Sequence, residues 1–160
     1  INKLNGTRTQ KILATKDGET KYIKEIVSWI INEVEKKPLI IIPYPSTDKD
    51  KNQLKQLPNI IAQEMHKYYK NWVDGSGFLT RKYSLPKNTR DETEQYKSLI
   101  IKNKKNLKKK NILLLDDVTS SGSSLLAGLK KLRTVKPKKL KALAVAKKVY
   151  LKDIPLSKLF

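Results

Sequence analysis

The hydrophobic positions in the first part of the chain follow a helical period and then a short continuous run. From Tyr22 onward apolar side chains recur every three or four residues, which predicts an amphipathic helix that ends before Pro38: Ile23, Ile26, Val27, Ile30 and Val34. The run Leu39–Ile42 stands between two prolines, and its length and β-branched side chains favour a strand buried on both faces. The run Lys11–Ala14 is a candidate edge strand.

The rest of the chain alternates between helical periods and short apolar runs. In chain order we expect a helix over Asn59–Trp72 that ends at Asp74–Gly77, a strand or arm and then a loop over Phe78–Arg90, a helix over Asp91–Asn103, a strand over Asn111–Asp116, a helix through Leu125–Leu132 and a strand over Leu140–Ala146. This alternation favours an α/β fold with a mostly parallel sheet flanked by helices. We expect residues 1–21 to form an N-terminal arm or small hood on a domain over residues 22–160.

Length and composition exclude several classes of protein. A chain of 160 residues fits one domain whose core needs no disulfides. The absence of cysteine excludes a disulfide scaffold, a cysteine zinc site and a cysteine nucleophile. The longest apolar runs, Leu39–Ile42 and Ile112–Leu115, are far shorter than the about 20 residues of a membrane-spanning helix. We therefore expect a cytoplasmic protein without membrane contact, although the sequence opens at Ile1 and an upstream targeting segment can be missing from it.

The chain is strongly basic. Its 35 Lys and Arg residues against 15 Asp and Glu residues give a net charge of +20, which attracts nucleic acid and phosphorylated small molecules. Nearly all of the basic residues are lysines, whereas the planar arginine fork is preferred for reading bases and phosphates. We expect the runs Lys102–Lys110 and Lys130–Lys141 to be solvated faces or turns. A nucleic-acid surface stays open as an alternative to a small polyanionic substrate.

The segment Ile112–Ser124 (ILLLDDVTSSGSS) carries the candidate chemistry. Its apolar residues predict a strand, and Asp116 and Asp117 follow at the carboxyl end, where parallel sheets place their ligands. The loop Thr119–Ser124 offers successive backbone N–H groups and hydroxyls, and Gly122 permits a tight turn. Because the next helix directs its positive end to the same point, the segment predicts a site for a phosphate monoester.

This motif differs from two common phosphate-binding sequences. It contains no Gly-x-x-x-x-Gly-Lys, and its single glycine does not make a dinucleotide fingerprint. An ordinary strand–turn–helix with an acidic N-cap accounts for Asp116 or Ser120 alone, but not for the whole series of residue types. That series resembles the phosphoribosyl-pyrophosphate (PRPP) signature of type I phosphoribosyltransferases, in which four apolar residues precede Asp-Asp, one apolar residue and a Thr/Ser-rich loop with glycine.

The order of elements over about Tyr22–Lys148 most resembles the competence protein F (ComF) type of phosphoribosyltransferase domain. In that type a helix precedes a strand that ends in Pro-x-Pro, here Pro43-Tyr44-Pro45, and Arg90 and Gln95 echo a polar segment of its relatives. The resemblance implies a Rossmann-like, mostly parallel sheet with a small hood or arm.

The resemblance also implies a role for each residue of the motif. Asp116 and Asp117 would bind the ribose hydroxyls, and they would approach Mg²⁺ only through water or the ribose. The loop residues would hold the 5′-phosphate: Thr119, Ser120, Ser121, Gly122, Ser123 and Ser124. The loop after the first strand would face the pyrophosphate: Tyr44, Pro45, Ser46 and Thr47.

Cations for the leaving pyrophosphate are expected outside the motif. Arg81, in the arm between Gly77 and Pro86, is the candidate for a catalytic residue on a mobile lid, with a merely solvent-facing side chain as the alternative. Relatives of the ComF type usually carry a basic run after Pro-x-Pro. This chain has Lys49 and Lys51 there, which can substitute as point charges.

The family resemblance implies a pentosyl-transferring enzyme of nucleotide metabolism. It would move a phosphoribosyl group from PRPP to a nitrogenous base or amine with the help of Mg²⁺ and release pyrophosphate. The alternative is a non-catalytic PRPP- or nucleotide-binding module that acts in DNA uptake, nucleic-acid handling or regulation. A basic nucleic-acid-binding domain on the same fold is a third hypothesis. The acceptor cannot be read from the residues, and a homodimer is common among similar proteins.

Overall fold

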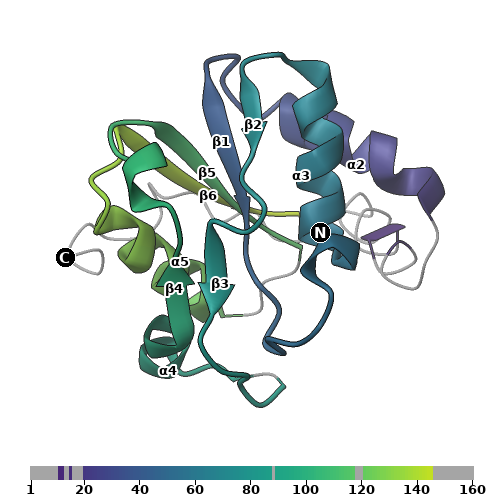
Figure 1. Cartoon of the computed structure of the whole chain (residues 1–160). Coiled ribbons are helices and arrows are strands. Elements are labelled where there is room, and N and C mark those ends of the chain that lie inside the picture. Colours follow the sequence, from purple (N-terminus) through teal and green to yellow (C-terminus); the bar gives the residue numbers. More distant parts are fainter. Residues whose placement is uncertain (1–10, 13–14, 16–19, 88, 118–120, 146–160) are drawn as a thin grey trace.

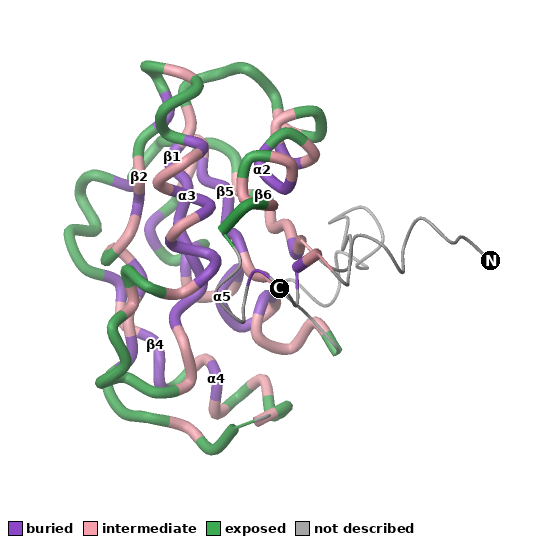
Figure 2. The backbone as a smooth tube through the Cα atoms, turned by 90° about the vertical axis from the view of Figure 1, so that its right-hand side faces the viewer, coloured by how far each residue is buried: buried purple, intermediate pink, exposed green. Residues whose placement is uncertain are grey.

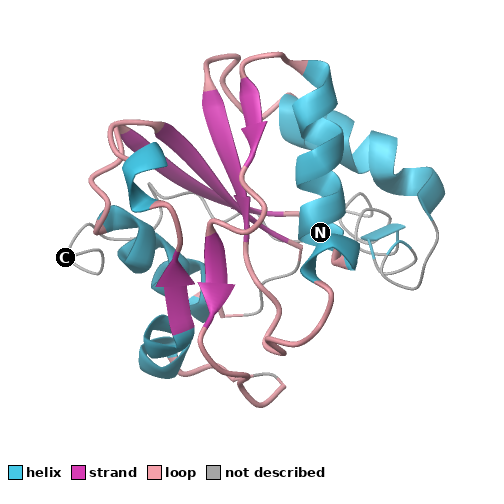
Figure 3. Cartoon of the chain, in the orientation of Figure 1, coloured by secondary structure: helices cyan, strands magenta, loops and turns pink. Residues whose placement is uncertain are grey.

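A parallel sheet forms the centre of the computed structural model, which describes residues 11–12, 15, 20–87, 89–117 and 121–145 (Figures 1 and 3). Its four strands are β1 (Leu39–Pro43), β2 (Trp72–Asp74), β5 (Asn111–Asp116) and β6 (Lys139–Ala144). They lie side by side in the order β2-β1-β5-β6, and every neighbouring pair is parallel. A separate antiparallel pair consists of β3 (Leu79–Arg81) and β4 (Leu99–Ile101). The mostly parallel α/β sheet expected from the sequence is confirmed.

Helices cover both faces of this sheet. The α-helices are α2 (Ile23–Ile31), α3 (Leu57–Tyr68), α4 (Glu92–Ser98) and α5 (Ser123–Arg133), and short 3₁₀ turns are η1 (Thr20–Tyr22), η2 (Gln53–Lys55) and η3 (Lys104–Asn106). Figure 1 shows α2 and α3 on one side of the sheet and α5 on the other, with β3, β4 and α4 beyond its lower end. No helix within the described residues is long and apolar enough to cross a membrane.

Alternation along the strands divides the core between the two faces. Ile41 faces α2 and α3, where its cluster includes Ile26 and Met65, whereas Ile40 and Ile42 face α5 and the β3–β4 pair. Figure 2 shows the resulting buried strands within more exposed loops. Because both faces of β1 and β5 are covered, their sequences are continuous apolar runs, as expected for buried parallel strands.

The ends of two expected helices were wrong. The helix expected to reach Trp72 ends at Tyr68, because Trp72 begins β2, where it pairs with Leu39 and is fully buried. The helix expected to reach Asn103 ends at Ser98, because the apolar residues after it pair with β3 as strand β4. In each case pairing with another strand prevails over a local helical period.

The N-terminal segment is helical where it is described, and it is not the edge strand that its sequence suggested. Lys11, Ile12 and Thr15 have helical backbone, and the Thr15 hydroxyl donates to the Lys11 carbonyl at 2.7 Å. Ile12 is fully buried in the same cluster as Ile26 of α2. This part of the segment therefore packs on the helical layer over the sheet.

Candidate active site

The carboxyl ends of β1 and β5 lie side by side and bring two predicted loops together. Pro43 is the register partner of Leu115, and the Tyr44 N–H donates to the Leu115 carbonyl at 2.7 Å. The loop after Pro43 and the two carboxylates after Leu115 therefore meet at one edge of the sheet. A cavity of about 480 Å³ opens there between these loops and the β3–α4 segment.

This cavity joins most of the residues expected to form the site. Its lining includes Tyr44, Pro45, Ser46, Thr47, Lys51, Arg81, Asp116, Asp117, Ser121 and Ser124. Thr119 and Ser120 lie outside the described residues. Gly122 and Ser123 are not among the lining residues but occupy the start of α5. Lys49 does not line the cavity either, and its amine lies 3.8 Å from a carboxylate oxygen of Asp50.

Ser121, Gly122 and Ser123 are the described residues that lead from the loop into α5. Gly122 has φ +79, in the left-handed region that glycine adopts readily, and its carbonyl accepts the first helical bond, from Leu126 N–H at 2.9 Å. The Oγ atoms of Ser121 and Ser123 are 2.8 Å apart. Since the first N–H groups of a helix have no partner within it, this end of α5 suits a negatively charged group.

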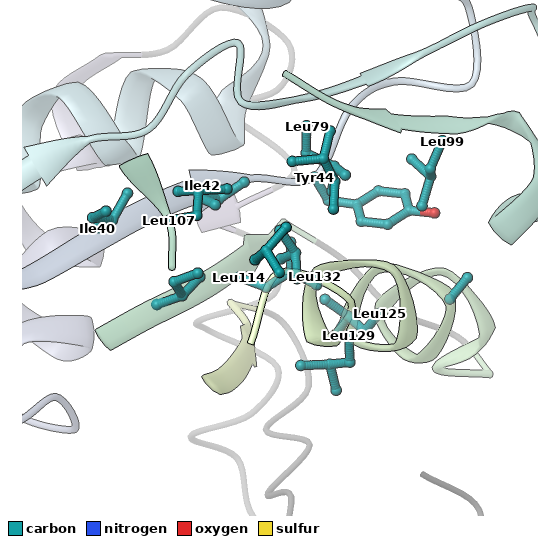
Figure 4. Packing of buried hydrophobic residues seen from close by; sticks show 14 of the residues in the cluster. Ile40, Ile42, Tyr44, Leu79, Leu99, Leu107, Leu114, Leu125, Leu129 and Leu132 are labelled. Carbon is teal, nitrogen blue, oxygen red and sulfur yellow. The ribbon is translucent and has the colours of Figure 1, made fainter. Parts of the chain in front are cut away.

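Tyr44 connects the floor of the cavity with the core. Its ring packs among Leu79, Leu99 and the side chains of α5 (Figure 4), and its hydroxyl donates to Oε1 of Gln95 at 2.9 Å. Burial raises the pKa of Tyr44 to about 12, and the negative charge of Asp116 acts in the same direction against the opposing effect of Arg81. The phenol therefore keeps its proton, and its hydrogen bond to Gln95, at neutral pH.

Arg81 is buried beneath the loop that follows β1 and is not exposed on an open arm. Its Nε donates to the Ser46 carbonyl at 2.6 Å, and its Nη2 donates to Oε1 of Gln95 at 2.8 Å and to the Pro45 carbonyl at 3.4 Å. Its Nη1 donates to the Ser98 hydroxyl. In this conformation Arg81 holds the loop in place, while its role in catalysis stays a prediction.

The structure adds cavity residues that the sequence reasoning did not select. These are Gln56, Pro58, Lys87 and Thr89. They come from the start of α3 and from the loop before α4, where no motif distinguishes them from ordinary polar loop residues. Gln95 was noted only as an echo of related sequences, yet it is almost fully buried and bonded to both Tyr44 and Arg81.

Comparisons with known proteins found a matching family model and similar solved structures. The family model for the phosphoribosyl transferase domain matches residues 56–153. A crystal structure of a hypoxanthine-guanine phosphoribosyltransferase from Bacillus anthracis, with HEPES in its active site, is 21% identical at a TM-score of 0.50 and matches 78% of this chain and 65% of its own. A second structure of that Bacillus anthracis enzyme is 18% identical at a TM-score of 0.48, over 78% of this chain and 62% of its own.

This chain therefore spans just under two thirds of the length of those structures. The comparison with curated proteins found no match. The fold agrees with that of the Bacillus anthracis structure with HEPES, and the family model covers more than half of the sequence. We conclude that the protein belongs to the phosphoribosyl transferase domain family.

Proposed function

We propose that the chain binds PRPP together with Mg²⁺ and transfers the phosphoribosyl group to a nitrogenous acceptor. One observation carries this proposal: a single cavity holds the loop after β1, the buried cation Arg81 and the paired carboxylates Asp116 and Asp117 beside the start of α5. These groups suit the two charged ends and the ribose of PRPP. Membership in the phosphoribosyl transferase domain family supports the same assignment.

The substrate would lie along the edge of the sheet. Its 5′-phosphate would occupy the start of α5, next to Ser121 and Ser124, and its ribose hydroxyls would donate to Asp116 and Asp117. The pyrophosphate would then extend toward Ser46 and Thr47, where Lys51 and Arg81 supply positive charge. Thr119 and Ser120 would complete the phosphate loop.

The donors in the cavity fit a magnesium ion that arrives with the substrate. Among the described residues, no group of three or more His, Asp or Glu side chains could hold a metal ion. Mg²⁺ is usually bound through one or two carboxylates plus substrate phosphates, and Asp116 and Asp117 would approach it through water or the ribose. When bound, Mg²⁺ would neutralise negative charge on the leaving pyrophosphate.

The reaction would need no covalent intermediate with the protein. The acceptor nitrogen would form a bond to C1 of the ribose while the C1–O bond breaks, pyrophosphate would leave with the electron pair, and the acceptor would lose a proton. The protein would contribute position through Asp116, Asp117 and the loop before α5, and charge through Arg81 and Lys51.

Two features support assignment to the ComF type within the family. The strand β1 ends in Pro43-Tyr44-Pro45, which places a rigid turn directly above the cavity. Arg90 and Gln95, in the segment that echoes ComF relatives, both line the same cavity. We leave the acceptor as a base or amine.

Calorimetric titration with PRPP and Mg²⁺ tests the proposal. We expect saturable binding that weakens about tenfold in each of Asp116→Asn and Asp117→Asn, because each loses a charged acceptor for a ribose hydroxyl. Glu64→Gln, which removes the same charge from α3 outside the cavity, should bind as the unaltered chain does. If the unaltered chain fails to bind PRPP at low salt with Mg²⁺ present, the proposal is wrong.

The phosphate loop can be tested through its backbone conformation alone. A Cβ on Gly122 would meet no atom within 4 Å, so Gly122→Ala acts only through the left-handed φ of +79. We expect about 1 kcal/mol of destabilisation and roughly tenfold weaker PRPP binding as the loop relaxes. Gly77→Ala is the matched control, because Gly77 has φ +88 in equally open space but lies outside the cavity lining. Equal PRPP affinity in the two variants would contradict the assigned phosphate position.

An assay of pyrophosphate release distinguishes an enzyme from a non-catalytic binding module. We would incubate the protein with PRPP, Mg²⁺ and a panel of purine bases, pyrimidine bases and amines. Release that depends on one acceptor identifies the enzyme and its substrate class. Saturable PRPP binding without release by any of these acceptors would instead favour the non-catalytic module.

A further inference from the structure

A second cavity, of about 520 Å³, opens at the opposite edge of the sheet, where β1 and β5 begin. Its lining includes Leu39 at the start of β1 and Asn111 at the start of β5. At about 3.3 Å per residue, β1 separates Leu39 from Tyr44 in the first cavity by roughly 16 Å. In Figure 1 this edge is the upper end of β1 and β2. The proposed PRPP chemistry makes no use of this cavity.

The rim of this cavity is positively charged. Lys37, Lys109, Lys110 and Lys138 line it, and none of the lining residues is acidic. The nearby carboxylate of Glu35 is engaged by Lys37, Lys139 and Lys141, whose proximity lowers its pKa to about 2. Among the described residues, Lys109, Lys110 and Lys138 form no ion pair within 4 Å. The rim therefore suits an anion.

The backbone of two turns brings these lysines together. Lys109 has φ +58 and Lys136 has φ +53, values that cost a residue with a side chain about 1 kcal/mol or more. The two turns are joined by hydrogen bonds, from Lys109 N–H to the Lys136 carbonyl at 3.0 Å and from Lys138 N–H to the Lys110 carbonyl at 2.8 Å. The two lysine runs that were expected to be solvated faces or turns, Lys102–Lys110 and Lys130–Lys141, are therefore hydrogen-bonded to each other beside this cavity.

The other residues that line the cavity are apolar or carry amide groups. Phe78 is half-buried and Val73 is 46% exposed, so both offer apolar surface at the cavity. The amides of Asn71, Asn106 and Asn111 also line it, and Asn111 Nδ2 donates to the Pro38 carbonyl at 3.0 Å. These groups match the parts of a nucleotide. The aromatic ring can stack on a base, the amides can donate to and accept from its polar atoms, and the lysines can bind its phosphate.

We propose that this cavity binds a nucleotide, with the base against Phe78 and the phosphate on Lys109, Lys110 and Lys138. Its volume lies within the about 300–1,000 Å³ that is common for small-molecule sites. The nucleotide is either free in solution or one unit of a single strand, since both present a base beside a phosphate. The site is independent of PRPP binding, so either proposal can fail without the other.

Nuclear magnetic resonance titration with adenosine 5′-monophosphate tests this site. We expect amide shifts at Phe78, Asn106 and Asn111, and at least tenfold weaker binding in the double variant Lys109→Gln/Lys138→Gln. The matched control is Lys24→Gln/Lys67→Gln, which removes the same charge from exposed positions on α2 and α3 and should change the affinity less than twofold. Asp116→Asn should retain these shifts, because it alters only the first cavity.

Further probes separate the parts of the ligand and its two sources. Ribose 5-phosphate, which has no base, should bind at least several-fold more weakly than adenosine 5′-monophosphate, and Phe78→Leu should remove that difference. A single-stranded adenine oligonucleotide that binds more tightly than the mononucleotide would identify a strand as the source, and equal affinity would identify the free nucleotide. Absence of shifts at this cavity, or equal binding of ribose 5-phosphate and the nucleotide, would overturn the proposal.

Discussion

Arg81→Met is expected to lower the free energy of unfolding by about 3 kcal/mol and PRPP affinity about 100-fold. Methionine fills much of the volume of arginine but cannot donate to the carbonyls of Ser46 and Pro45. These carbonyls would lose their charged donor beside the cavity, and the loop after β1 would lose its support. Urea denaturation measures the first effect, and calorimetric titration with PRPP and Mg²⁺ measures the second.

Two further variants distinguish the position of Arg81 from its charge. Arg81→Lys keeps the charge but loses the planar fork that reaches both Ser46 and Gln95, so we expect it to recover only part of the stability and affinity. Lys82→Met removes the same charge from the next, exposed residue and should leave both quantities nearly unchanged. If Arg81→Met bound PRPP as well as Lys82→Met does, neither the loop support nor the charge assigned to Arg81 would be needed.

Gly75→Ala is expected to destabilise the protein by about 3 kcal/mol, because a methyl group would collide with the central strand. A Cβ at this position would lie 2.6 Å from the Ile41 carbonyl oxygen and 2.9 Å from Cγ1 of Ile42. The Gly75 N–H also donates to that carbonyl at 2.7 Å, which fixes the close approach. Since Ile41 pairs with Leu113 of β5, the backbone of β1 cannot move away without loss of sheet bonds.

The control for this prediction is again Gly77→Ala. A Cβ on Gly77 would meet no atom within 4 Å, so only its φ of +88 opposes the substitution, at a cost of about 1 kcal/mol. Urea denaturation of the two variants should therefore rank Gly75→Ala as clearly less stable. Equal losses would show that the collision is relieved by local movement and that the contact with β1 is not tight.

Features that depend on neighbouring residues in the chain could be predicted from the sequence. The strand over Asn111–Asp116 was predicted with its observed bounds, and the strand at Leu39 was predicted to within one residue. Both are continuous apolar runs bounded by polar residues or prolines, a signal that is complete within the segment itself. The glycine before α5 adopts the left-handed conformation that the turn requires for the same local reason.

Features that depend on pairing between distant segments could not be predicted in this way. Trp72 continues a helical period in the sequence, yet its pairing with Leu39 makes it the start of a strand. The apolar residues after Ser98 likewise continue a helical pattern but pair with β3. A short apolar segment serves either structure, and the choice depends on which partner strand is available in space.

The sequence by itself determined the α/β class, because helical periods and short apolar runs alternate along the chain, and it placed two adjacent carboxylates at the end of β5, because strand and carboxylates are consecutive residues. Only the tertiary structure decided that Arg81 lies beneath the loop after β1 and bonds to Ser46 and Gln95. It also decided that separate lysine runs join around a second cavity at the other edge of the sheet. Both arrangements depend on strand register and helix packing, which bring together residues that no local pattern connects.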